Sequence, residues 1–121
     1  MALIRVFYIE DQSAQRFQLP GAGAATAVQV RALGGYRQVT EFTSLSTGVD
    51  AARLVENIVS GTSESEVQAR NHLLPGVSRG LIPGDLVEIE SDSAWVWLRS
   101  GWQRLPELAQ NCIIAQIPVV F

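Results

Sequence analysis

The stretch LIPGDLVEIESDSAWVWLRSGWQRL, from Leu81 to Leu105, decides the fold that this sequence predicts. Apolar and polar residues alternate on both sides of the Ser-Asp-Ser sequence at 91–93. The pattern stops at the Ser-Gly pair at 100–101 and resumes at Trp102. Such alternation is typical of half-buried strands, and the polar breaks are typical of the turns between them. We therefore predict a three-stranded antiparallel meander over residues 81–105.

All three tryptophans of the chain fall in this stretch. Because successive strand side chains alternate between the two faces, Trp95, Trp97 and Arg99 should share one face. Ala94, Val96 and Leu98 should share the other face. Both faces then carry large or apolar groups, whereas the face of a sheet that lies in water is usually polar. The tryptophan face must therefore be covered by the rest of the chain or by a partner.

The composition indicates a single folded domain over residues 1–121. The chain is 47% hydrophobic and 17% charged, as is typical of globular proteins, and it is long enough to bury a core. Its net charge of −3 gives no electrostatic basis for binding nucleic acid or an anionic membrane. All nine basic residues are arginine, which GC-rich coding explains most simply, although arginine is also enriched at protein interfaces.

The single cysteine, Cys112, excludes an internal disulfide and a cysteine-based zinc site built by one chain. It lies in an apolar run without charged neighbours, so we expect it to be a small buried hydrophobe. The N-terminal MALIRVFYIEDQ is too short and too charged for a signal peptide or a membrane span. We expect the protein to fold in a reducing cytoplasm and not to be secreted by a signal peptide.

The whole pattern predicts a β-rich α+β protein. We expect an antiparallel sheet, or a small barrel or sandwich, of about six to eight strands with one or two short helices. Before the meander, a flexible loop is expected at 21–26, and a hairpin turn at the Gly34-Gly35 pair. Outside the meander, strands are expected at 2–9, 16–19, 28–33, 36–45 and 112–121.

Two segments between 47 and 74 predict helices. Thr47 and Asp50 resemble a capping box, and apolar residues follow at helical spacing, which predicts a helix over 49–60. A strand over 54–59 is the alternative, since this segment is rich in β-branched residues. A polar, acidic stretch starting at Thr62 predicts a second cap and a short helix over 67–74.

No set of residues in the sequence indicates catalysis, a cofactor or a metal, and we predict a protein that is not an enzyme. His72 is the only histidine and is expected at the surface, near a helix end. Gly21 and Gly23 lack the third glycine and the other parts of a dinucleotide fingerprint.

Four carboxylates cluster in the meander, and they predict a solvated strand face with an acidic turn. A cation site or a sugar site is the less common alternative for such a cluster. The four residues are Asp85, Glu88, Glu90 and Asp92.

The meander also resembles the small β modules of tailed-bacteriophage structural proteins. The resemblance covers the last third of the chain. It consists of a Gly-Asp turn at 84–85, an apolar strand at 86–89, the aromatic stretch AWVW at 94–97 and the motif SGWQRL at 100–105. It implies a virion component, such as a capsid cement or decoration protein, a head-to-tail joining protein or a tail part. Such proteins work by assembly, without catalysis.

Two functions are weighed. The first is a structural protein that binds protein partners, either other copies of itself or other virion subunits, as a homo-oligomer or docked on a repeating lattice. Its location would be the virion, if the resemblance holds. The alternative is a small carbohydrate- or peptide-binding module with the tryptophans as its platform, and a small enzyme ranks last. The candidate interface residues are Trp95, Trp97, Arg99, Trp102, Arg104, Ile117, Val119 and Phe121. The C-terminal strand that carries the last three is expected either in the core or against a neighbouring subunit, with Pro118 favouring a sheet edge.

Overall fold

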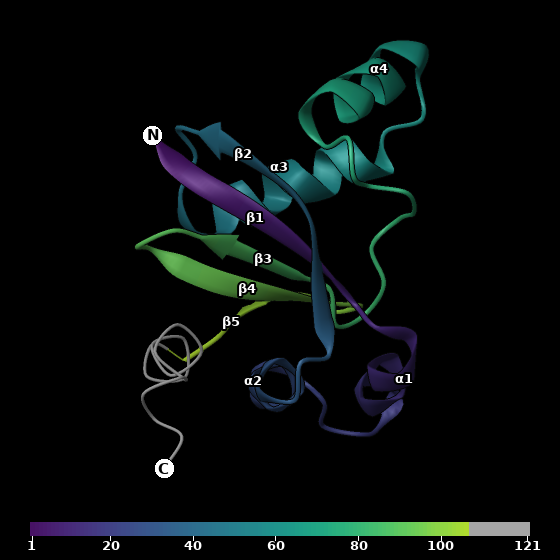
Figure 1. The fold of residues 1–121 in the computed structure, drawn as a ribbon, viewed down its shortest axis with the longest axis vertical. Helices are drawn as coiled ribbons and strands as arrows, with labels where there is room; N and C mark the ends of the chain where they lie inside the picture. Colours follow the sequence, from purple (N-terminus) through teal and green to yellow (C-terminus); the bar gives the residue numbers. More distant parts are fainter. Residues whose placement is uncertain (107–121) are drawn as a thin grey trace.

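The computed structural model of the chain describes residues 1–106, which form one antiparallel sheet with helices packed on both faces (Figure 1). The strand order is β2-β1-β3-β4-β5. The strands are β1 (Ala2–Ile9), β2 (Tyr36–Ser44), β3 (Leu86–Ile89), β4 (Ser93–Leu98) and β5 (Gly101–Arg104). The helices are α1 (Asp11–Ala14), the 3-10 helix η1 (Gln15–Gln18), α2 (Ala24–Ala32), α3 (Gly48–Ser60) and α4 (Glu64–Leu73).

Strand β1 joins the two halves of the sheet, because it pairs with β2 on one side and with β3 on the other. The β1–β2 register shifts between Val6 and Phe7, where Val6 pairs with Thr40 and Phe7 with Gln38. Val39 is thus the extra residue of a β-bulge, which bends the strand locally. From β3 the chain continues through β4 to β5 as consecutive antiparallel neighbours.

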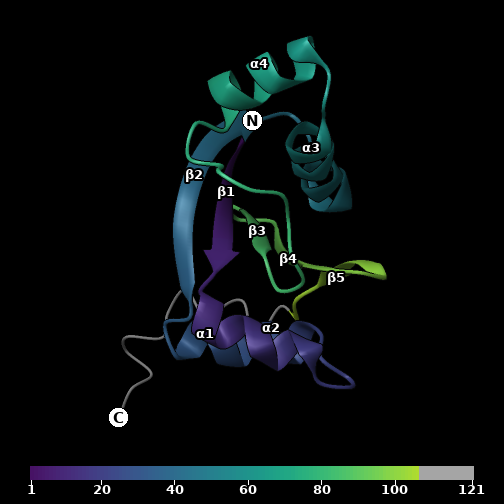
Figure 2. The same ribbon diagram turned by 90° about the vertical axis from the view of Figure 1, so that its right-hand side faces the viewer.

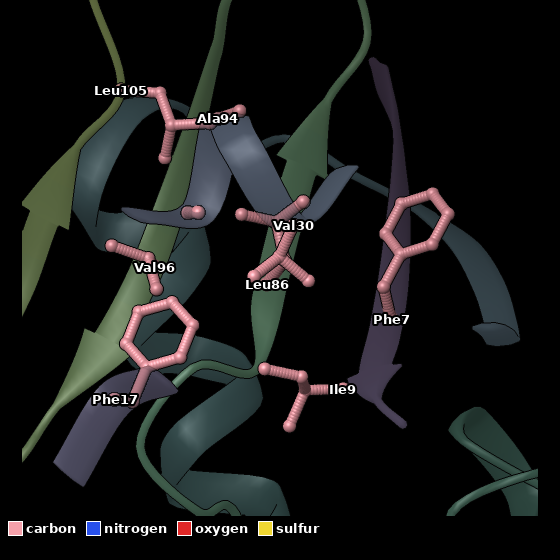
Figure 3. Packing of buried hydrophobic residues seen from close by; sticks show 9 residues of the cluster. Phe7, Ile9, Phe17, Val30, Leu86, Ala94, Val96 and Leu105 are labelled. Carbon is pink, nitrogen blue, oxygen red and sulfur yellow. The ribbon is translucent and has the colours of Figure 1, made fainter. Parts of the chain in front are cut away.

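Each face of the sheet has its own hydrophobic core. On one face, residues of η1 and α2 such as Phe17 and Val30 pack on Phe7, Leu86 and Val96 of the strands (Figure 3). On the other face, Ala51, Ala52, Val55 and Val59 of α3 pack on Ile4, Val6, Val87 and Ile89. Figure 2 shows α3 and α4 at one end of the molecule and α1 and α2 at the other. The two-sided burial explains why both faces of the meander carry apolar residues.

The predicted α+β class with an antiparallel sheet is confirmed. The three-stranded meander, the strand at 2–9 and the helices after residues 47 and 62 are also present. Residues 1–106 hold five strands and four α-helices, compared with the six to eight strands and one or two helices expected for the whole chain. The strand predicted over 112–121 lies outside the described residues.

The prediction of a strand over 28–33 was wrong, because this segment belongs to helix α2. Gly34, with φ of +75°, ends the helix instead of turning a hairpin. Its N–H donates to the carbonyl of Arg31, and the N–H of Gly35 donates to that of Val30, the two bonds of a Schellman motif. Tyr36–Ser44 is a strand as expected, but its partner is β1.

Two smaller predictions near the N-terminus were also wrong. Residues 16–19 were expected to be extended, but residues 11–18 form the short helices α1 and η1. The second of these, η1, buries Phe17 in the core. The loop expected over 21–26 ends early, because α2 begins at Ala24. Its first turn is held by Thr26 Oγ1, which accepts a hydrogen bond from the N–H of Gly23 at 3.1 Å. No helix among residues 1–106 is long and apolar enough to cross a membrane.

Candidate protein-interaction surface

The meander places the three tryptophans and Arg104 on one face of β4 and β5. Trp97 lies directly opposite Trp102, and Trp95 lies opposite Arg104. Directly opposed side chains of an antiparallel pair share a face. Arg99 follows β4, in the turn that leads to β5. We call these five residues the tryptophan–arginine surface. The register agrees with the sequence prediction that Trp95 and Trp97 share a face.

Helix α3 covers part of this surface and fixes two of the indoles. Glu56 Oε1 accepts a hydrogen bond from Trp102 Nε1 at 2.9 Å, and Glu56 Oε2 accepts one from Trp97 Nε1 at 3.1 Å. One carboxylate thus bridges a cross-strand pair of indoles. The cover that the sequence requires for the tryptophan face therefore comes in part from the chain itself. The indoles of Trp95, Trp97 and Trp102 are half-buried, so part of each stays in contact with solvent.

Trp95 is fixed by a separate polar chain that also caps α3. Its Nε1 donates to Ser93 Oγ at 2.7 Å, and Ser93 Oγ donates to Asp92 Oδ2 at 3.0 Å. Asp92 Oδ2 also accepts from the N–H of Gly48 at 2.8 Å. The predicted cap residue, Thr47, makes no side-chain capping bond. A carboxylate from the β3–β4 turn therefore supplies the cap, and it ties the tryptophan strand to the helix that covers it.

The remaining predicted interface residues divide into two groups. Arg99 and Arg104 are exposed, and neither forms a salt bridge within residues 1–106. Ile117, Val119 and Phe121 lie outside the described residues. The described part of the candidate interface thus consists of three hydrogen-bonded, half-exposed indoles and two arginines.

The acidic cluster of the meander differs from the prediction. Asp85 is fully buried and Glu88 is 8% exposed, while Glu90 and Asp92 are exposed. Glu88 carries two arginine partners, Arg5 at 3.4 Å and Arg31 at 3.3 Å. The two buried carboxylates therefore bind groups of other elements inside the protein and do not form a solvated strand face. Buried charges require such partners, because an unpaired buried charge is costly.

Asp85 belongs to a buried clasp that the sequence analysis missed. Its carboxylate forms a two-point contact with the Arg79 guanidinium at 2.7 and 3.0 Å, and it accepts the N–H groups of Ile9 and Ile82 at 3.0 and 2.9 Å. The hydrogen bond with Asp85 raises the pKa of Arg79 above its ordinary value, with burial acting in the opposite direction. The Arg79 guanidinium also lies 3.8 Å from the centre of the Tyr8 ring. These contacts fasten the 74–85 connection onto β1.

Tyr36 completes the same region from β2. Its hydroxyl donates to the carbonyl of Gly84 at 2.5 Å. Burial, followed by the charge of Asp85, raises the pKa of Tyr36 above its ordinary value. The sequence marked this region only by the Gly-Asp turn at 84–85 and by Asp85 in the acidic cluster, and neither feature predicted the clasp.

A cleft of about 890 Å³ lies at the β4–β5 turn, on the face of the sheet that η1 and α2 cover. Phe17 of η1, Ile82 and Leu98 contribute apolar walls, and Arg99 and Ser100 line it at the turn. The sequence contained no signal for this cleft, because its walls come from three separate parts of the chain. The apolar lining residues pack against the core on this face, whereas Trp95 and Trp102 pack against the core on the α3 face.

Within residues 1–106, no group of three or more histidine, cysteine or acidic side chains is arranged to hold a metal ion. His72 is exposed at the end of α4, as expected. The features of the described residues are the half-exposed tryptophan–arginine surface, the cleft and the buried carboxylate contacts. No protein-family model, curated protein or solved structure matches this chain.

Proposed function

We propose that this protein is a non-enzymatic structural protein of a bacteriophage virion, which acts through contacts with copies of itself or with other virion subunits. The observation that carries the assembly role is the tryptophan–arginine surface, with its half-exposed indoles beside two arginines. The virion assignment is supported by the resemblance of residues 83–105 to phage structural modules.

Three physical properties of the surface support protein binding. Tryptophan and arginine are the residues most enriched among those that dominate binding energy at protein interfaces. Glu56 fixes the orientation of Trp97 and Trp102, so little side-chain entropy remains to be lost when a partner binds. Arg99 and Arg104 are exposed donors that suit carboxylates of a partner.

Light scattering coupled to size-exclusion chromatography tests the assembly role, with protein loaded from about 1 μM to about 1 mM. We expect the molar mass to rise with concentration. Arg104→Glu should suppress the rise, because it reverses a charge on the surface. Arg16→Glu, at an exposed site on η1, is the matched control and should behave as the unchanged protein.

A chain that stays monomeric at every concentration contradicts self-assembly. If its tryptophan fluorescence then responds to glycans, the carbohydrate-binding alternative is favoured. The virion assignment has its own test in the gene neighbourhood, where we expect genes for capsid or tail proteins. Neighbouring genes for a metabolic pathway would contradict it.

A further inference from the structure

The cleft beside the β4–β5 turn has the size and lining of a binding site. Its volume of about 890 Å³ falls within the range of about 300–1,000 Å³ that is typical of ligand pockets. Phe17, Ile82 and Leu98 come from η1, the 74–85 connection and β4, so three separate elements converge on it. The buried Phe17 anchors one wall, because it belongs to the hydrophobic core below.

The charge in the cleft has one sign. Arg99 is the only charged side chain among the described residues that line it, and the other polar lining groups are neutral. Arg99 is exposed and forms no salt bridge within residues 1–106. A guanidinium beside apolar walls favours a partner group that combines apolar side chains with a carboxylate, since arginine binds carboxylates through two parallel hydrogen bonds.

We propose that this cleft docks an apolar peptide segment of a partner subunit that carries an acidic residue between its apolar side chains. The apolar side chains lie between Phe17, Ile82 and Leu98, and the carboxylate binds Arg99. This inference rests on the proposed assembly function, and it names the chemistry of the partner. A peptide is favoured over a free small molecule because the proposed function is assembly with protein partners.

Nuclear magnetic resonance titration tests the proposal with two capped peptides, acetyl-Leu-Glu-Phe-amide and acetyl-Leu-Gln-Phe-amide. The ¹⁵N-labelled chain is used at a concentration where it is monomeric. We expect the backbone amide signals of Leu98 and Ser100 to shift with both peptides. The glutamate peptide should bind about threefold more tightly at low salt, as an exposed ion pair allows.

Two variants and one control separate the effect of charge from the effect of shape. Arg99→Gln should abolish the preference for the glutamate peptide, and Arg53→Gln, at an exposed site on α3 outside the cleft, should keep it. Ala22→Leu narrows the cleft and should weaken the binding of both peptides. These positions are exposed or half-buried, so the variants are expected to fold.

Three results would overturn the proposal. They are unchanged cleft signals with both peptides up to their solubility limit, equal affinity for the two peptides, and a preference for glutamate that survives in Arg99→Gln. Because the titration uses the monomer, a failure of self-assembly in the light-scattering experiment would refute the proposed function without altering this result. The two ideas therefore fail separately.

Discussion

The buried carboxylate of Asp85 gives the sharpest stability prediction. It is 0% exposed and accepts four hydrogen bonds, two from Arg79 and one each from the N–H groups of Ile9 and Ile82. Asp85→Asn preserves the shape of the side chain but replaces one acceptor oxygen with an NH₂ group. That NH₂ then faces hydrogen-bond donors, so at least two of the four bonds are lost.

The structure sets the size of the effect. A hydrogen bond to a charged group contributes about 1.5–3 kcal/mol, and breaking a buried ion pair by removing one partner costs about 3–5 kcal/mol. Arg79 is 32% exposed, so water partly resolvates its guanidinium after the change. We therefore expect Asp85→Asn to lower the free energy of unfolding by about 3 kcal/mol, the low end of that range.

Urea unfolding at neutral pH, followed by tryptophan fluorescence, measures this loss. Arg79→Gln and the double variant complete a mutant cycle, in which we expect a coupling free energy of at least about 1 kcal/mol. Glu90→Gln is the control, because this exposed carboxylate in the same stretch should change stability by less than about 0.5 kcal/mol. A loss below about 1 kcal/mol for Asp85→Asn would refute the assignment of Asp85 as the centre of the clasp.

Three further predictions concern the same framework. The raised pKa of Tyr36 means that the folded chain holds this proton more tightly than the unfolded chain, so stability should fall as pH rises above the ordinary tyrosine value of about 10. In Tyr36→Phe, the free energy of unfolding measured in urea should fall less steeply with pH above that value than in the unchanged protein. Equal slopes in the two proteins would contradict a raised pKa of Tyr36. Gly76→Ala places a Cβ 1.7 Å from the carbonyl oxygen of Val39, which should destabilise the fold by about 2 kcal/mol in thermal unfolding. Asp92→Ala removes the bond to the N–H of Gly48 and should cost about 1 kcal/mol, with faster amide exchange in the first turn of α3.

The sequence predicted the elements whose periodicity is strong and local. The meander alternates cleanly, and the apolar residues of α3 recur at helical spacing, so both were identified. Residues 28–33 were assigned to a strand because Val28, Val30 and Ala32 alternate with the residues between them, as strand residues do, although the segment lies in α2. The Gly34-Gly35 pair suits a hairpin turn and a helix C-terminus equally, and only the packing of Val30 and Phe17 in one core decides between them.

The sequence predicted that Trp95 and Trp97 share a face, but it did not predict what surrounds them. Alternation alone placed Trp95, Trp97 and Arg99 on one face. The role of Glu56 was not predictable, because it lies 41 and 46 residues from the two indoles that it binds. Long-range contacts of this kind depend on where α3 docks, which no local pattern specifies.

The central claim is that this chain works by docking its tryptophan–arginine surface. Footprinting by hydroxyl-radical oxidation is its most direct test. The oxidation of Trp97 and Trp102 is measured by mass spectrometry in dilute protein and in the assembled state found by light scattering. We predict that oxidation of both indoles falls on assembly, while the exposed Leu45 reacts equally in the two states. Indoles that react equally in both states, with protection elsewhere on the molecule, would contradict the account.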